Sequence, residues 1–168
     1  MMKNQSNPIV LDNNTLVAWC EAKDENRVVR LDYLFKTAKD SHQKIIIPTP
    51  VLAEFLALAG EARRDFLDYL RRSPAVTIEP FDEPSAIEAA FFADAARSSG
   101  DKKYGTSEPI QKIKVDTQIV AIAKVHQAGQ IISGDIGVHK IGRVAAIKVA
   151  NIEDLPLPPQ EAQHNLVL

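Results

Sequence analysis

Short apolar runs rich in Ile and Val alternate along this chain with longer segments whose apolar residues recur at helical spacing. The short runs predict strands, and the longer segments predict amphipathic helices. Because the two kinds of segment alternate, the pattern favours a mostly parallel sheet covered by helices over a β-sandwich or a helical bundle. Strands are expected at residues 8–12, 44–47, 76–79, 130–133 and 146–149.

The segments between and around these strands predict six helices and two irregular regions. The helices are expected at residues 15–22, 28–41, 50–59, 61–72, 84–98 and 115–128. Residues 99–112 contain two glycines and a proline with few apolar residues, which predicts a loop long enough to be functional. The last segment, 151–168, contains three prolines and predicts an extended tail after a single domain of residues 8–150.

Composition narrows the class of protein. A chain of 168 residues with 45% hydrophobic content is typical of one globular domain. No apolar stretch approaches the ~20 residues that span a bilayer, and no apolar signal core precedes the first strand, so we expect no membrane segment and a cytoplasmic location. The single cysteine, Cys20, excludes an internal disulfide and a thiolate zinc site.

Two aspartates directly follow predicted strands. Asp12 follows Ile9-Val10-Leu11, and Asp135 ends the turn Ser133-Gly134-Asp135 after another strand. In an open parallel sheet, ligands bind where the carboxyl ends of the strands meet the loops. Each aspartate also has a purely local interpretation, as a helix cap for Asp12 and as a turn residue for Asp135.

Two further acids lie on predicted helices. Glu54 is the only charged residue between Pro48 and Ala59, so we expect its carboxylate to lie against apolar surface unless it reaches solvent at the helix edge. Asp116 is expected in the first turn of its helix, on or beside the apolar face that points to the sheet. The helix dipole alone would favour a negative charge at that position.

Four carboxylates at one sheet edge would repel one another unless a cation neutralised them. Mg²⁺ or Mn²⁺ fits a set of oxygen ligands without His or Cys, and the four histidines show no metal-ligand spacing. With no plausible pairing of a nucleophile and a base, the chemistry favoured by Asp12, Glu54, Asp116 and Asp135 is metal-assisted phosphodiester hydrolysis.

Four stretches of the chain together resemble the PIN-domain nucleases, which include the VapC-type toxins of bacterial toxin–antitoxin pairs. These stretches are IVLDNNTLVAW, IIIPTPVLAEFLAL, KVDTQIVAIAKVHQAG and QIISGD, in the order and approximate spacing of that family over residues 8–150. The resemblance implies a PIN-like three-layer α/β fold with a central, mostly parallel sheet of four or five strands. It also implies Mg²⁺ or Mn²⁺ at the four acids, endonucleolytic cleavage of RNA, and supporting roles for Asn14 and Ser133.

The resemblance further implies a homodimer and, for a toxin, an antitoxin protein that restrains the nuclease. The alanine-rich segment 86–92 is an independent hint of a self-association surface, although a central helix would show the same pattern. The net charge is −2, yet residues 97–150 carry nine Lys or Arg against four acids. RNA contacts are therefore expected at lysines in and after the long loop, namely Lys102, Lys103, Lys112 and Lys114.

Two other functions remain open from the sequence. A phosphotransfer or phosphatase domain also clusters aspartates at a sheet edge, but it relies on a well-placed lysine and on paired acids near the first strand, where this chain has Asn13 and Asn14 after Asp12. The other alternative is a PIN-fold nucleic-acid-binding or regulatory protein outside a toxin–antitoxin system.

Overall fold

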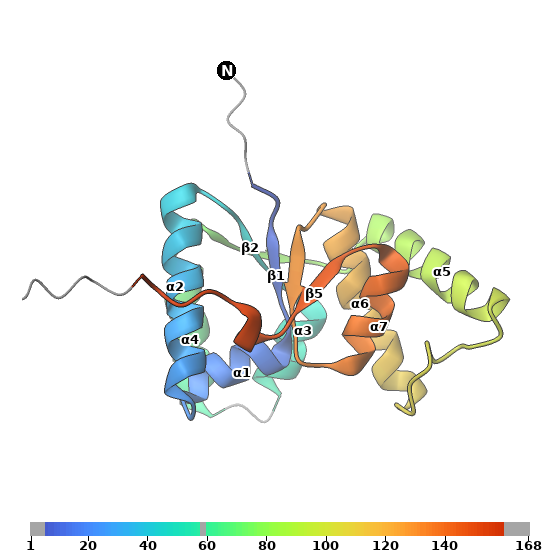
Figure 1. Ribbon diagram of the computed structural model, residues 1–168, viewed down its shortest axis with the longest axis horizontal. Helices are drawn as coiled ribbons and strands as arrows, with labels where there is room; N and C mark the ends of the chain where they lie inside the picture. Colours follow the sequence, from blue (N-terminus) through green and yellow to red (C-terminus); the bar gives the residue numbers. More distant parts are fainter. Residues whose placement is uncertain (1–5, 58–59, 160–168) are drawn as a thin grey trace, which may run out of the picture.

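The computed structural model describes residues 6–57 and 60–159 and shows a five-stranded sheet between two layers of helices (Figure 1). The strands are β1 (Ile9–Leu11), β2 (Ile45–Pro48), β3 (Val76–Glu79), β4 (Gln130–Ile132) and β5 (Lys148–Ala150). Their order is β3-β2-β1-β4-β5, and every neighbouring pair is parallel. This confirms the predicted three-layer α/β fold.

Helices connect the strands and cover both faces of the sheet. They are α1 (Asn13–Glu21), α2 (Glu25–Ser41), α3 (Thr49–Leu56), α4 (Glu61–Arg71), α5 (Glu83–Ser98), α6 (Ile110–Val125) and α7 (Ile136–Ala145). Helices α2 and α4 lie on one side of the sheet, and α5, α6 and α7 lie on the other (Figure 1). None of the helices in the described part of the chain is long and apolar enough to cross a membrane.

The core lies on both faces of the central strands. β1 and β2 are buried along their whole length, as expected for parallel strands covered on both sides. Helix α6 is also a core element, because the run Ile119–Ala123 is buried without interruption. Burial of each large aliphatic side chain contributes roughly 1.5–3 kcal/mol. A helix held this firmly against the sheet gives Asp116, on its second turn, a fixed position.

Helix α6 begins earlier than the sequence predicted. It starts at Ile110, directly after Pro109, so the predicted loop 99–112 ends at Pro109. Proline is unfavourable inside a helix but compatible with its first residues, which is why a Pro-containing stretch can border a helix start. Asp116 therefore lies on the second turn of α6, and the expectation of a first-turn position was wrong.

Helix α7 was not predicted at all. It contains Gly137 and Gly142, and glycine has a low helix propensity. Both glycines lie where the helix backbone closely approaches other groups. A Cβ at Gly142 would lie 2.5 Å from Cγ2 of Val149 on β5, so a side chain there would force α7 or Val149 to shift.

The first part of the predicted tail packs against the domain. Ile152 begins a short 3₁₀ helix (Ile152–Asp154), and both Ile152 and Leu155 are buried. Arg27 of α2 donates from Nε to Oε1 of Glu153 over 2.7 Å, and Arg30 of α2 donates to the carbonyl oxygen of Leu155. The expectation of an extended tail is therefore wrong for these residues, while residues 160–168 lie outside the described part of the chain.

Candidate active site

The site lies at the carboxyl ends of β1 and β4, where the strand order reverses. From β1 the chain proceeds to β2 on one side, and β4 lies on the other side. The amide of Asp12 donates to the carbonyl oxygen of Ile132 over 3.1 Å, so Asp12 stands beside the last residue of β4. Such a switch point is the usual ligand site of an open α/β sheet.

Ser133 links the two aspartates that follow these strands. Its Oγ donates to Oδ2 of Asp12 over 2.5 Å and accepts from the amide of Asp135 over 3.0 Å. Ser133 is fully buried, so this hydroxyl is shielded from competing water. Asp12 also caps α1, because its Oδ1 accepts from the amide of Asn13 over 2.7 Å. The capping role and the site role of Asp12 thus coexist.

Lys112 brings Asp116 and Asp135 together. Its Nζ donates to Oδ2 of Asp116 over 3.3 Å and also to Oδ2 of Asp135. Asp116 is only 5% exposed, and it lies one helical turn after Lys112 on α6. The sequence placed Lys112 among the RNA-binding lysines and gave no sign that its ammonium would contact the acids.

Gly137 leaves the space that the Asp116 carboxylate occupies. A Cβ at this position would overlap Oδ2 of Asp116 and lie 3.2 Å from Oδ1 of Asp135. The amide of Gly137 donates to the same Oδ1 over 2.8 Å, so Asp135 caps α7. The start of α7 therefore shapes the site, and Gly137 is a site residue that the sequence did not reveal.

Glu54 approaches the other acids from a more exposed position than theirs. It is an exposed residue of α3, which favours the alternative in which the side chain reaches solvent at the edge of the helix. Partial loss of solvent nevertheless raises the pKa of Glu54, and the charges of Asp12 and Asp135 raise it further. Part of the predicted helix 50–59 lies outside the described residues, which stop at Ala57 and resume at Gly60.

The electrostatics of the buried acids reflect their crowding. Burial raises the pKa of Asp12, and the hydrogen bond from Ser133 partly offsets that effect. Burial, followed by the charge of Asp135, raises the pKa of Asp116 to about 7 in spite of Lys112. Partial burial lowers the pKa of Lys112, but its contacts with Asp135 and Asp116 outweigh this and raise it. These acids retain protons more readily than free aspartate does.

The chemistry of these residues fits a hard divalent cation. The side chains supply only carboxylate oxygens and one hydroxyl, which are ligands of the Mg²⁺ and Mn²⁺ type. Within residues 6–57 and 60–159, however, no group of three or more His, Cys, Asp or Glu side chains is placed so that it could hold a metal ion. The ammonium of Lys112 lies between Asp116 and Asp135 instead. The four-acid metal set therefore stays a prediction.

Two polar side chains hold the turn between β4 and α7. Oδ1 of Asn14, which was predicted to support the site, accepts from the amide of Gly134 over 3.3 Å. Nε2 of His139 lies 2.8 Å from the carbonyl oxygen of Ser133. No pattern in the sequence pointed to His139, because its contact depends on α7, which was not predicted.

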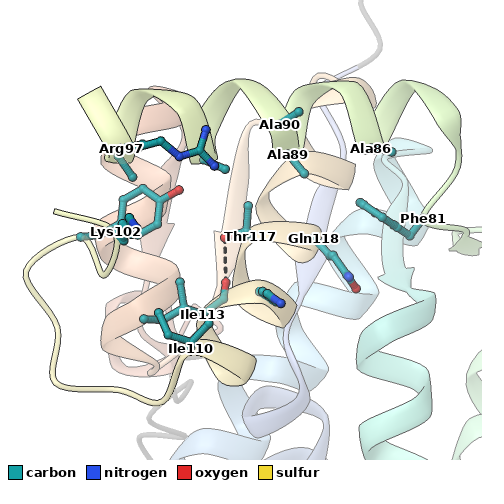
Figure 2. Close-up of a pocket in the computed structure, with 14 residues that line it drawn as sticks. Phe81, Ala86, Ala89, Ala90, Arg97, Lys102, Ile110, Ile113, Thr117 and Gln118 are labelled. Carbon is teal, nitrogen blue, oxygen red and sulfur yellow. Dashed lines mark hydrogen bonds between the residues drawn. The ribbon is translucent and has the colours of Figure 1, made fainter. Parts of the chain in front are cut away.

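The other predicted lysines lie elsewhere. Lys102 and Lys114 line a cavity of about 480 Å³ between α5 and α6, whereas Lys103 lies in the loop before α6. Figure 2 shows alanines of α5 on one side of this cavity, Ile110 and Ile113 of α6 on the other, and Arg97 and Lys102 at one end. None of the described residues that line it is one of the four acids. Lys102 and Lys114 therefore line this cavity, whereas Lys112 contacts the acids.

The fold and the acidic switch point define an α/β protein with a carboxylate site between β1 and β4. The PIN domain family matches residues 9–144, which is most of the chain, and the protein belongs to this family. A comparison with curated proteins found no match.

Solved structures with a similar fold include three of VapBC proteins. The chain shares 15% identity and a TM-score of 0.62 with VapBC2 from Rickettsia felis bound to a promoter DNA fragment, covering 85% of this chain and 97% of that one. With DNA-bound VapBC from Salmonella typhimurium the chain shares 15% identity and a TM-score of 0.59, covering 87% of this chain and 98% of that one. With VapBC-1 from nontypeable Haemophilus influenzae it shares 14% identity and a TM-score of 0.58, covering 86% of this chain and 98% of that one. At these identities, the comparisons establish the fold.

Proposed function

We propose that this protein is an endoribonuclease that uses Mg²⁺ or Mn²⁺ to hydrolyse RNA phosphodiester bonds at Asp12, Glu54, Asp116 and Asp135. The observation that carries the proposal is the meeting of Asp12, Asp116 and Asp135 at the switch point of the sheet, through Ser133 and Lys112. Membership of the PIN domain family supports it.

The protein's own residues have distinct tasks in this mechanism. Ser133 fixes the orientation of Asp12, and the amide of Gly137 fixes that of Asp135. Asp116 is held against the core by α6, and Glu54 adds negative charge from α3. A divalent ion bound by these carboxylates would activate water and stabilise the leaving oxygen of the phosphodiester. Burial raises the pKa values of Asp12, Glu54 and Asp116, and a bound cation would favour their charged forms.

The RNA backbone would be bound by lysines near α6. Lys102 and Lys114 are both exposed and line the same cavity. Lys103 lies in the adjoining loop, and Lys112 lies at the acids themselves. Phosphate contacts by such side chains supply affinity for nucleic acid with little sequence preference.

We further propose that the nuclease is the toxin of a type II toxin–antitoxin pair. The similar solved structures are VapBC proteins, which supports an antitoxin partner for this chain. A homodimer is proposed on a separate observation: Ile87 and Phe91, one turn apart on α5, are 51% and 63% exposed. Large apolar side chains grouped on a surface mark an interaction site.

The nuclease proposal is tested by removing one charge at a time. Asp12→Asn, Glu54→Gln, Asp116→Asn and Asp135→Asn should each abolish Mn²⁺-dependent RNA cleavage while the protein stays folded, because each change removes a charge and little volume. Asp68→Asn, an exposed acid on α4, serves as the matched control and should keep full activity. Full cleavage in EDTA, or by the Asp116→Asn protein, would contradict the mechanism.

The toxin proposal has its own test. Expression of the chain alone in a bacterial host should arrest growth, whereas expression of the Asp12→Asn form should not. Equal growth of the two strains would leave a nuclease but remove the case for a toxin. A small reading frame beside the gene, whose product binds this chain and restores growth, is the expected antitoxin.

A further inference from the structure

Lys112 is the only described lysine whose ammonium contacts two of the four proposed metal-binding acids. It reaches Oδ2 of Asp116 on its own helix and Oδ2 of Asp135 on the turn before α7. The side chain of Lys112 is 36% exposed, whereas those of Asp116 and Asp135 are 7% and 20% exposed. The ammonium therefore covers the two carboxylates from the solvent side.

The position of this ammonium is set by the fold. Lys112 and Asp116 are four residues apart on α6, so their side chains lie on the same face of the helix. Asp135 is held in place by two hydrogen bonds: its carboxylate accepts from the amide of Gly137, and its own amide donates to Oγ of Ser133. The lysine therefore meets two carboxylates that are fixed from two different segments.

A metal ion held by these acids would compete with the ammonium for the same two carboxylates. Within residues 6–57 and 60–159 the acids are not placed to hold a metal ion as they stand. Two of them are instead neutralised by a cation that belongs to the chain. A divalent ion held by Asp116 and Asp135 and the Lys112 ammonium would repel each other, because both cations would lie beside the same two carboxylates.

We propose that Lys112 is a resident counter-cation, which holds Asp116 and Asp135 together in the metal-free protein and is displaced when a divalent ion binds. This role rests on the proposed function, because it presupposes the metal site, and it would regulate how readily a divalent ion binds there. Lys112 is a positioning residue that sets the threshold concentration for metal binding. Its role differs from that of Lys114, two residues further along α6, which lines the cavity between α5 and α6.

The test is a calorimetric titration of the full chain with Mn²⁺ in the absence of RNA. Lys112→Met keeps most of the length of the side chain and removes its charge, so the Kd for Mn²⁺ should fall by about tenfold, a common size for coupling between two bound species. Lys112→Arg retains a cation that can bridge two carboxylates and should give a Kd close to that of the native chain. Lys114→Met, which removes a charge from the same helix, should also leave the Kd near the native value.

Folding is checked by thermal unfolding in EDTA and in Mn²⁺. Lys112→Met should unfold at a lower temperature than the native protein in EDTA and regain the difference in Mn²⁺.

If the native chain binds Mn²⁺ and Lys112→Met binds it no more tightly, the counter-cation role is overturned while the metal site stands. Equal tightening by Lys112→Met and Lys114→Met also overturns it, as a general charge effect. If neither the native chain nor Lys112→Met binds Mn²⁺, the metal site of the proposed function is overturned together with this inference.

Discussion

The carboxylate of Asp116 on α6 occupies the space that a side chain at Gly137 on α7 would fill. A Cβ at residue 137 would occupy the place of Oδ2 of Asp116, so the absence of a side chain on the first turn of α7 allows the carboxylate of α6 to stand beside Asp135. The site therefore depends on a residue that has no side chain to act with.

The first prediction is that Gly137→Ala impairs the site more than it impairs the fold. The added methyl group must displace the Asp116 carboxylate, because Asp116 is a short side chain on a buried helix. We expect Mn²⁺ affinity, measured by calorimetry, to fall by at least about tenfold, with a loss of stability of roughly 1–3 kcal/mol, as for other small-to-large changes.

Gly134→Ala is the matched control for this change. A Cβ there would meet only Nδ2 of Asn14, at an ordinary contact distance of 3.8 Å, in the same β4–α7 turn. This variant should bind Mn²⁺ as the native chain does. Unchanged Mn²⁺ binding by Gly137→Ala would show that the space beside Asp116 has no role in holding the ion.

The second prediction concerns pH and the metal-free protein. The pKa of Asp116 is raised from 3.8 to about 7, so between these values the folded state retains a proton that the unfolded chain releases. Stability in EDTA should therefore decrease as the pH rises from about 4 to about 7, and then level off. The decrease should not exceed a few kcal/mol, since each pKa unit corresponds to about 1.4 kcal/mol.

Asp116→Asn removes this titration. In urea unfolding series at several pH values, the variant should show a flatter profile between about pH 4 and pH 7 and a higher stability than the native chain at pH 8. Asp68→Asn, an exposed change, should follow the native profile. Parallel profiles for the native chain and Asp116→Asn would mean that Asp116 ionises normally.

The positions of two site residues, Asp12 and Asp135, could be predicted from the sequence because both lie at strand ends. Asp12 and Asp135 directly follow apolar runs, and the carboxyl ends of parallel strands share one edge of a sheet. The supporting role of Ser133 was implied by the resemblance to PIN-domain nucleases, and in the structure its hydroxyl donates to Asp12. The neighbouring positions of β1 and β4 are a property of the topology, which local patterns do not encode.

The other features of the site depend on packing between segments, which the spacing of apolar residues cannot predict. Helix α7 contains two glycines, which have a low helix propensity. Glycine fits these two positions because a side chain there would collide with Asp116 or Val149. In α3 nearly every residue is apolar, so the pattern could not show which side would be left uncovered, and Glu54 proved to be exposed. The contact of Lys112 with Asp135 joins two segments far apart in the sequence, beyond the reach of any helical pattern.

The third prediction separates the RNA path from the acids. Lys102 and Lys114 line one cavity, and the double variant Lys102→Ala/Lys114→Ala should weaken RNA binding without changing Mn²⁺ affinity. The slope of log affinity against log salt should decrease by about 0.7 for each phosphate of single-stranded RNA that the variant no longer neutralises. Fluorescence anisotropy at several salt concentrations, with a labelled RNA and the inactive Asp12→Asn background, measures this slope.

Lys36→Ala is the control for the salt slope. Lys36 is an exposed lysine paired with Asp40 on α2, on the opposite side of the sheet from α5 and α6 (Figure 1). Its replacement should leave the slope unchanged. If the slope of the double variant also stays at the native value, the RNA path runs elsewhere, and the arginines of α4 and its end become the next candidates: Arg63, Arg64, Arg71 and Arg72.

The fourth prediction is that α5 mediates a homodimer. Phe91 is 63% exposed, and Phe91→Glu would place a charge in the proposed interface, where an unpaired charge is strongly unfavourable. Light scattering should give a dimer mass for the native chain and a monomer mass for Phe91→Glu at the same concentration.

Tyr69→Glu is the matched control, because Tyr69 is a 54% exposed aromatic residue on α4, across the sheet, and this variant should stay dimeric. A monomer mass for the native chain at high micromolar concentration would refute the dimer. Dimers of both the native chain and Phe91→Glu would place the interface on another surface.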